Sequence, residues 1–170
     1  MNMVEATLEQ QNGGYAAKVG EQTIGLGRET LDARPALGTY AGRTVVLGIR
    51  PEDIEDVALA PDTRGDHRLK GKVDLTEALG SEIMVHFSVD AKPAMTDDVR
   101  ELVQDVGDDR AHQQLAAAET ATMVGRFGAR SRIRTEEPVE VAVDTRALHF
   151  FDPETGLGIY DGTSTKGGGA

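Results

Sequence analysis

Residues 4–19 read VEATLEQQNGGYAAKV, with apolar and polar residues alternating on both sides of an Asn-Gly-Gly turn. The alternating apolar positions are Val4, Ala6, Leu8, Tyr15, Ala17 and Val19. A period of two is typical of a strand with one buried face, and a turn dipeptide between two such runs favours a tight reversal. The stretch therefore predicts a β-hairpin at the start of the chain.

Working outward, further short apolar runs follow along the whole sequence. We predict strands at residues 23–26, 44–49, 69–76, 83–89, 122–127, 139–143 and 147–151. The β-branched run at 44–49 is stopped by Pro51, which cannot donate to a strand ladder. Residues 30–42 contain Pro35 and Gly38 and are predicted to be a connection. Many short strands joined by turns predict an all-β barrel or sandwich.

One segment breaks the strand pattern. Residues 96–107 carry a threonine cap, two acids, apolar residues three and four apart, and a closing glycine, which together predict a helix. A second helix is predicted at 110–120, so we expect a helical insertion near residues 95–121. The acidic pairs at 97–98 and 108–109 are interpreted as helix starts. The Gly-rich residues 163–170 are predicted to be a disordered tail behind one domain spanning 1–162.

Composition excludes several classes of function. The 170 residues include 18 Lys+Arg and 29 Asp+Glu, giving a net charge of −11, which opposes nucleic-acid binding. The absence of cysteine excludes disulfides, thiolate zinc sites and thiol nucleophiles. No apolar run approaches the roughly 18 residues of a membrane span, so we expect no direct membrane insertion. The start of the chain also lacks the pattern of a secretion signal.

The motif search predicts no catalytic, cofactor-binding or metal-binding residue. Neither a G-x-x-x-x-G-K-[ST] phosphate loop nor a G-x-S-x-G nucleophile motif occurs. The run GLGRET at 25–30 lacks the third glycine of a dinucleotide loop, and we interpret its glycines as turn residues with positive φ. The histidines are scattered singly and are interpreted as surface or core residues, at positions His67, His86, His112 and His149. Glu136 and Glu137 are interpreted as a solvated turn.

One dense basic cluster leaves two interpretations open. Its members are Arg126, Arg130, Arg132 and Arg134. They form either a patch for an anion or an acidic partner, or a charged edge strand with its turn that discourages sheet-to-sheet aggregation.

Three blocks look like more than generic β-sequence. They read LGIRPEDI at 47–54, LTEALGSEIMVHF at 75–87 and VEVAVDTRALHFFDPETG at 139–156. The blocks resemble, in order and spacing, the G-I-R-P-E signature and two later blocks of the ATP-binding subunits of sugar-type ABC importers, such as those for maltose, trehalose and glycerol-3-phosphate. The residues that carry the resemblance are Gly48, Arg50, Pro51, Glu52, Glu77, Gly80, Phe150, Phe151, Asp152 and Gly156.

The resemblance implies a C-terminal regulatory region of OB-like or MOP-like barrels, the TOBE class. It also implies a homodimer through this region and contacts with the subunit's own ATPase domain, with the transporter's membrane subunits and with a regulatory protein. The expected location is cytoplasmic, peripheral on the inner face of the membrane. Walker A, Walker B and L-S-G-G-Q are absent from the sequence, so we expect the chain to be cut at a domain boundary, with ATP and Mg bound elsewhere.

Physically, the signature residues are interpreted as structural. Gly48 permits close packing, Pro51 ends a strand, and Arg50 and Glu52 fasten the turn to a neighbouring strand or a second subunit. Asp152 to Gly156 is predicted to be a hairpin turn with the glycine in the left-handed region.

Two questions stay open at this stage. One ring of Phe150 and Phe151 is expected in the core and the other at an interface, without a choice between them. The pair Glu136 and Glu137 stands where the family commonly has a turn glycine. The alternative function is a stand-alone domain that binds an oxyanion or small ligand through Arg130, Arg132 and Arg134.

Overall fold

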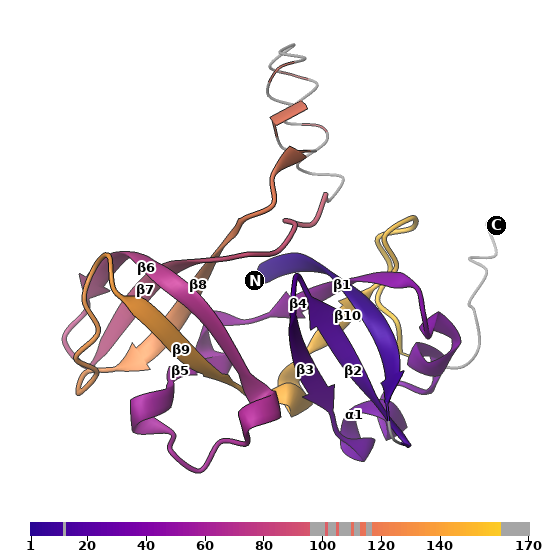
Figure 1. The fold of residues 1–170 in the computed structure, drawn as a ribbon, viewed down its shortest axis with the longest axis horizontal. Helices are drawn as coiled ribbons and strands as arrows, with labels where there is room; N and C mark the ends of the chain where they lie inside the picture. Colours follow the sequence, from indigo (N-terminus) through magenta and orange to yellow (C-terminus); the bar gives the residue numbers. More distant parts are fainter. Residues whose placement is uncertain are drawn as a thin grey trace, which may run out of the picture.

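The computed structural model describes residues 1–11, 13–95, 101, 105, 110, 113–114 and 117–160. Over these residues the chain forms two antiparallel sheets lying side by side (Figure 1). The strands are β1 (Asn2–Gln11), β2 (Gly14–Val19), β3 (Gln22–Leu26), β4 (Thr44–Ile49), β5 (Ile54–Asp56), β6 (Arg68–Ala78), β7 (Glu82–Val89), β8 (Ala121–Gly128), β9 (Pro138–Val143) and β10 (His149–Phe151).

The strand orders show how the chain moves between the two sheets. The first sheet has the order β10-β4-β1-β2-β3 and the second β5-β9-β6-β7-β8. After completing β9 in the second sheet, the chain returns to the first sheet with β10, which pairs with β4. The predicted opening hairpin is confirmed, because Gln11 pairs with Gly14 and Gly13 has φ +80°.

The second sheet curls until its edge strands β5 and β8 approach each other. The backbone N–H of Gly128 donates to Oε1 of Glu55 at 3.1 Å across this seam. Gly125 permits the approach, since a Cβ there would lie 3.0 Å from Cγ2 of Ile54. The nearly closed sheet confirms the predicted all-β, OB-like barrel architecture.

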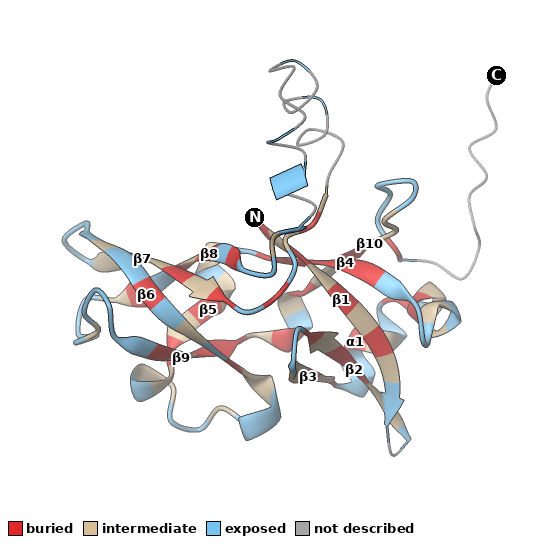
Figure 2. Cartoon of the chain, turned by 45° about the horizontal axis from the view of Figure 1, so that its top comes forward, coloured by how far each residue is buried: buried red, intermediate tan, exposed pale blue. Residues whose placement is uncertain are grey.

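A hydrophobic core runs through both sheets. Buried and partly exposed residues alternate along β1, as a strand with one inward face requires (Figure 2). The largest core side chains come from strands of both sheets: Phe87 from β7, Phe127 from β8 and Phe150 from β10 are fully buried.

Short helices fill the connections. They are α1 (Arg28–Asp32) and the 3-10 turns η1 (Pro35–Tyr40), η2 (Pro51–Asp53), η3 (Val57–Leu59), η4 (Gly65–His67) and η5 (Thr145–Ala147). The predicted connection at 30–42 therefore contains the end of α1 and all of η1.

Three local predictions are wrong. Strand β5 was not predicted, and the strand predicted at 147–151 begins only at His149 because η5 precedes it. The glycines of the GLGRET run do not have positive φ. Gly25 instead leaves room for Asp66, whose Oδ2 would lie 2.5 Å from a Cβ at this position.

Most of the predicted helical insertion lies outside the described residues, as do the acidic pairs at 97–98 and 108–109, His112 and the tail at 163–170. The described residues 101, 105, 110, 113, 114 and 117 are helical, whereas residues 118–120 are not. The second predicted helix therefore ends before its predicted limit of Thr120.

Candidate functional site

Two of the three motif blocks meet on the first sheet. Strands β10 and β4 pair antiparallel, with His149 opposite Gly48 and Phe151 opposite Val46. The middle block forms the β6–β7 hairpin of the other sheet (Figure 1). The structure thus brings the Gly48 and Phe151 regions together and keeps Glu77 and Gly80 apart from them.

Gly48 is a buried position of β4 that neighbouring side chains cover. A Cβ at this position would lie 2.5 Å from Sδ of Met1, 3.1 Å from the Phe151 ring and 3.3 Å from Cβ of His149. The rings of His149 and Phe151 stack with centroids 6.5 Å apart. These residues, Met1, Gly48, His149 and Phe151, are called the Gly48 surface below.

The Gly48 surface combines partly exposed apolar groups with an exposed charge at its rim. Met1 is 53% exposed and Phe151 is half-buried, while Phe150 on the opposite face of β10 is fully buried. Phe150 is therefore the core ring and Phe151 the outer one. Arg50 follows β4 at the rim and is exposed, and among the described residues its side chain has no ion pair or hydrogen bond.

The pKa of the His149 imidazole is lowered in this setting. Burial lowers the pKa of its imidazole, and the positive charges of Arg50 and Arg34 lower it further. Arg34 is itself buried, donates to the carbonyl of Leu148 at 2.5 Å and lies 5.9 Å from the ring centroid of Phe150. The sequence did not indicate His149 as part of a site. The available signal was the alternation along β10, which places His149 on the same face as Phe151 and opposite to Phe150.

Asp152 and Gly156 shape the hairpin that follows β10. The carboxylate of Asp152 accepts from the hydroxyl of Tyr40 at 2.6 Å and from the backbone N–H groups of Glu154 and Thr155 at 2.7 and 3.1 Å. Gly156 has φ +70° and its N–H donates to the Asp152 carbonyl at 2.8 Å. Both residues have a structural role in this turn.

Pro51 and Glu52 lie in η2, directly after the Gly48 strand. Pro51 occupies the first position of this turn, where its missing N–H costs nothing. Glu52 is exposed and, within the described part of the chain, its carboxylate has no hydrogen bond or ion pair to another side chain. The side chains of Arg50 and Glu52 thus do not bind a neighbouring strand. The predicted contact of these two residues with a second subunit stays a prediction.

The middle block forms a separate exposed tip. Nε2 of His86 lies 2.9 Å from Oε2 of Glu77, and Gly80 turns the hairpin with φ +85°. Leu79 at the tip is 57% exposed and Leu75 is 50% exposed. The tip belongs to the second sheet and does not contribute to the Gly48 surface.

The arginine cluster divides into two parts. Arg126 lies on the edge strand β8 and pairs with Glu82 at 3.1 Å, which fits the edge-strand interpretation. Arg130, Arg132 and Arg134 lie in the loop that follows this strand, between β8 and β9, so both interpretations remain for them. All three are exposed.

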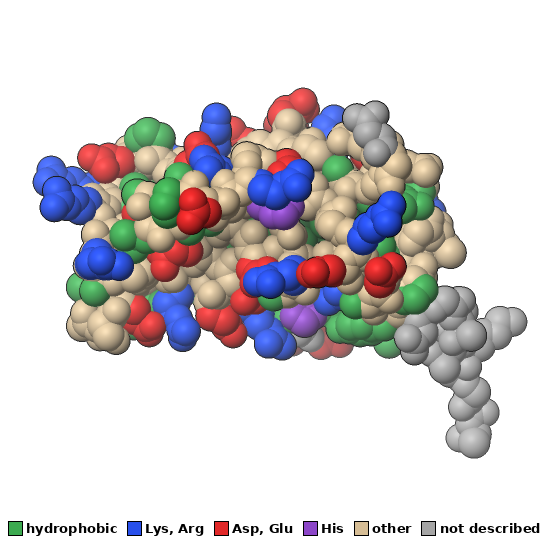
Figure 3. Space-filling view, turned by 90° about the horizontal axis from the view of Figure 1, so that it is seen from below, with side chains coloured by type: hydrophobic (Ala, Val, Ile, Leu, Met, Phe, Trp, Pro, Cys, Tyr) green, Lys and Arg blue, Asp and Glu red, His purple; other side chains and the backbone are tan. Residues whose placement is uncertain are grey.

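A groove of about 740 Å³ opens between the two sheets. Its charged lining residues are Arg28, Glu29, Glu52, Asp53, Glu55, Asp62, Arg64, His67, Asp144 and Arg146. Seen from below, basic and acidic side chains are interspersed over the surface (Figure 3). Part of this charge is satisfied internally, since Arg64 pairs with Asp66 and Arg146 with Asp144.

One carboxyl group that lines the groove has a raised pKa. Burial raises the pKa of Asp53, and the neighbouring carboxylates of Glu52 and Asp144 raise it further. Within the described ranges, no group of three or more His, Asp or Glu side chains is placed to hold a metal ion. None of the helices that the structure describes has the length and apolar character needed to cross a bilayer.

Comparison with known proteins agrees with this geometry. The MalK OB fold domain matches residues 1–54 and the TOBE domain matches residues 47–108. The trehalose/maltose import ATP-binding protein MalK of Thermococcus litoralis is 31% identical over 122 residues, covering 71% of this chain and 25% of that protein. The oligosaccharides import ATP-binding protein MsmX of Bacillus subtilis is 31% identical over 120 residues, with the same coverage.

A third relative is the trehalose import ATP-binding protein SugC of Mycobacterium tuberculosis, which is 29% identical over 117 residues, or 68% of this chain and 28% of that protein. The chain spans about a quarter of the length of these curated relatives. It belongs to the family of MalK-type OB fold and TOBE domains found in the ATP-binding subunits of sugar ABC importers.

Proposed function

We propose that this chain is the regulatory and dimerisation domain of the ATP-binding subunit of a carbohydrate ABC importer, working on the cytoplasmic side of the membrane. The observation that carries the proposal is the Gly48 surface. It places half-buried Phe151 and 53% exposed Met1 beside exposed Arg50, on the sheet where two family blocks meet. An apolar centre with a charged rim is the usual composition of a protein interface.

A two-fold dimer would use this surface twice. In a two-fold interface the same patch of each copy is self-complementary. Phe151 and Met1 of one copy pack against Met1 and Phe151 of the other. Arg50 of each copy forms an ion pair with Glu52 of its partner, so each of these exposed side chains gains an oppositely charged neighbour.

Dimerisation of this region has a mechanical consequence for the whole subunit. Holding two copies together raises the effective concentration of the two ATPase domains for each other while they open and close. A regulatory protein that binds this domain in one state shifts that equilibrium by its difference in affinity between the states. In this proposal ATP and Mg bind the ATPase domain, which also contacts the membrane subunits of the transporter.

The experiment is sedimentation equilibrium of the chain over a wide concentration range. Wild type is expected to dimerise, and Phe151→Glu to remain monomeric because two buried carboxylates would face each other. The matched control is Leu79→Glu, which introduces the same charge at a 57% exposed position on the other sheet and should dimerise normally.

A charge exchange tests the rim. Arg50→Glu is expected to weaken dimerisation through repulsion with Glu52 of the partner, and adding Glu52→Arg in the same chain should restore it. A wild-type chain that stays monomeric at every concentration, or equal behaviour of Phe151→Glu and Leu79→Glu, would contradict the proposal.

A further inference from the structure

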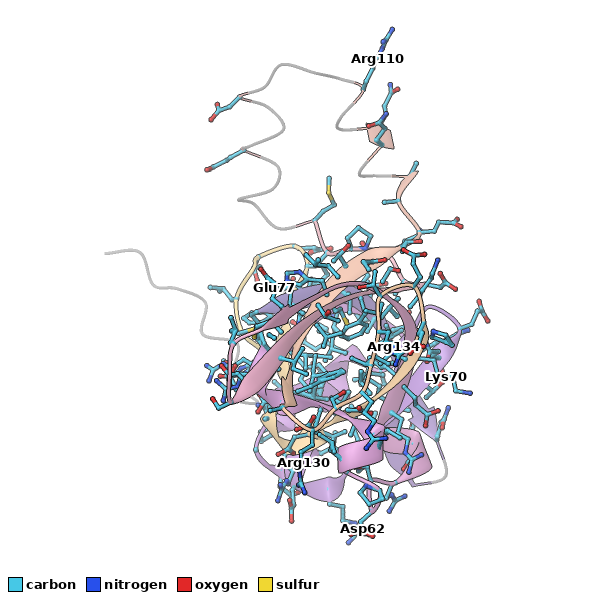
Figure 4. All side chains as sticks on the ribbon, turned by 90° about the vertical axis from the view of Figure 1, so that its left-hand side faces the viewer. Asp62, Lys70, Glu77, Arg110, Arg130 and Arg134 are labelled. Atoms are coloured by element: carbon cyan, nitrogen blue, oxygen red, sulfur yellow. The ribbon has the colours of Figure 1, made fainter. Side chains whose placement is uncertain are left out.

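The loop between β8 and β9 presents three arginines on one face. From residue 130 to residue 134, exposed and half-buried residues alternate, with Arg130, Arg132 and Arg134 exposed and Ser131 and Ile133 turned inward. Arg130 lies in the turn at 129–130 that follows β8, and residues 131–134 are a connection that belongs to neither sheet. The three residues are called the arginine row below. Figure 4 looks onto this end of the molecule and labels Arg130 and Arg134.

The inward face of the loop is anchored. Oγ of Ser131 donates to Oδ2 of Asp56 at 2.5 Å, and the Ser131 N–H donates to the Gly128 carbonyl at 2.9 Å. Ile133 packs against the hydrophobic core. A backbone held in this way loses little conformational entropy when a partner binds to its outer face.

The segment that follows the row is also fixed. The N–H of Glu136 donates to the Val73 carbonyl and the N–H of Val73 donates to the Glu137 carbonyl, both at 2.9 Å. The loop therefore continues into a paired backbone on β6. Both ends of the row are attached to the second sheet.

The arginine row has unsatisfied charge. Four arginines elsewhere in the described structure form ion pairs, Arg64 with Asp66, Arg68 with Glu140, Arg126 with Glu82 and Arg146 with Asp144, whereas others such as Arg50 do not. The described part of the chain provides no ion pair or side-chain hydrogen bond to the three guanidinium groups of the row. Each group is free to bind an external carboxylate.

We propose that the arginine row binds an extended acidic segment of a partner polypeptide, with carboxylates at alternate positions. Residues two apart have Cα atoms at most about 7 Å apart. Side chains on one face of an extended peptide have the same spacing, so three carboxylates at alternate positions meet three guanidinium groups in register. Guanidinium and carboxylate groups form charge-assisted, paired hydrogen bonds in this arrangement. The loop that carries the row is attached to the second sheet, whereas the proposed dimer surface is on the first, so the two sites are separate.

The overall charge favours a short acidic segment over an extended polyanion. The chain carries a net charge of −11, and Glu136 and Glu137 follow the row after Thr135. Charges are screened beyond about 8 Å at physiological salt, so a segment confined to the row avoids most of this repulsion. A nucleic acid or an anionic bilayer would extend past the row onto the acidic surface.

Fluorescence anisotropy with labelled peptides tests the proposal. The probe contains three glutamates at alternate positions separated by valines, and the control peptide has the same composition with the glutamates adjacent. The alternating peptide is expected to bind more tightly, and its affinity should fall as salt is raised. The protein variants are Arg132→Gln, expected to weaken binding about threefold, and the triple change Arg130→Gln, Arg132→Gln and Arg134→Gln, expected to weaken it about tenfold or more.

A charge-matched variant controls for the net charge. Lys18→Gln, Arg28→Gln and Lys92→Gln remove the same charge away from the row and should leave peptide affinity unchanged. Thermal unfolding monitored by circular dichroism checks that both triple variants fold. Equal affinity for the two peptides, or equal loss in the two triple variants, would overturn the proposal. Row-dependent binding to phosphatidylglycerol vesicles without binding of the alternating peptide would overturn it as well.

Discussion

The side-chain amide of Asn2 hydrogen-bonds to both backbone groups of Val124. Its Nδ2 donates to the Val124 carbonyl at 2.8 Å, and the Val124 N–H donates to its Oδ1 at 2.7 Å. The same Nδ2 also donates to the carbonyl of Ile49 at 3.0 Å. Asn2 is on β1 and Val124 on β8, so one buried amide joins the two sheets as an additional peptide group would.

Gln22 makes a similar link at another place. Its Nε2 donates to the Lys70 carbonyl at 2.8 Å, and the Lys70 N–H donates to its Oε1 at 2.7 Å. This bond joins β3 to β6 at an exposed position. The Asn2 and Gln22 links can therefore be compared, because they have similar hydrogen bonds and differ mainly in how far the side chain is buried.

Asn2→Ala should destabilise the fold strongly. The change removes three hydrogen bonds and leaves buried backbone groups without partners, which costs about 3 kcal/mol. Gln22→Ala should cost about 1 kcal/mol or less, because water can replace the exposed amide. Urea unfolding of the two variants measures the difference. Equal losses of unfolding free energy would show that burial does not set the strength of these links.

The Tyr40–Asp152 bond should give a pH-dependent contribution to stability. The hydrogen bond from Tyr40 lowers the pKa of Asp152, and the same bond to Asp152 raises the pKa of Tyr40. A lowered carboxyl pKa contributes stability above the ordinary value near 4, which is lost as pH falls through the folded value. A raised phenol pKa contributes stability below about 10, which is lost as pH rises through the folded value.

Tyr40→Phe should therefore reduce the free energy of unfolding by about 1 kcal/mol at neutral pH, with the deficit narrowing at both extremes. Urea unfolding at a series of pH values measures this deficit. Asp152→Asn is the control, because its amide oxygen still accepts from the turn but does not titrate. A deficit that stays constant from acid to alkaline pH would contradict the assigned pKa directions.

Two glycines should respond differently to a methyl group. A Cβ at Gly71 collides with the backbone carbonyl oxygen of Ser88, which β6–β7 pairing holds in place. Gly71→Ala should cost about 2–3 kcal/mol. A Cβ at Gly48 first meets the end of the flexible Met1 side chain, so Gly48→Ala should cost less than about 1 kcal/mol. Thermal unfolding of both variants measures the two losses of stability. A larger loss for Gly48→Ala than for Gly71→Ala would contradict the prediction.

Glu136→Gly should stabilise the fold. Glu136 has φ +70°, and a glycine relieves about 1 kcal/mol of backbone strain at such a position. The change also removes the exposed ion pair with Lys72 at 2.8 Å. This pair raises the pKa of Lys72, so its contribution is present below the ordinary lysine pKa and is lost as pH rises. The gain from Glu136→Gly should thus be larger at alkaline pH.

Glu137→Gly is the matched control, since Glu137 lacks a positive φ. It should destabilise the chain by about 0.5–1 kcal/mol through the entropy of the unfolded state. Urea unfolding of both variants at neutral and alkaline pH completes the test. Destabilisation by Glu136→Gly would contradict the strain assignment.

Local patterns in the sequence predicted most strands because their burial is regular. The alternation from Val4 to Val19 produced the first hairpin correctly. Strand β5 was missed because it has only three residues, Ile54–Asp56, which is too short for an alternation of apolar and polar residues to be seen. The two-sheet arrangement depends on pairings such as Asn2 with Val124, which are 122 residues apart and leave no local pattern.

The site was predictable only in part for the same reason. Gly48 and Phe151 were identified in separate blocks, but their contact depends on β10 returning to β4. Glu77 and Gly80 came from a block of similar strength and lie on the other sheet. Motif blocks therefore indicated which residues to examine, and the strand order decided which of them share a surface.

The return of β10 limits how this protein can be dissected. A fragment ending at residue 54, where the OB fold match ends, lacks β10 and leaves Leu47 without Phe150. In topological terms the second sheet is inserted into the first, between β4 and β10. Chimeras with related subunits should therefore exchange the central barrel as a cassette and keep both flanking segments from one parent.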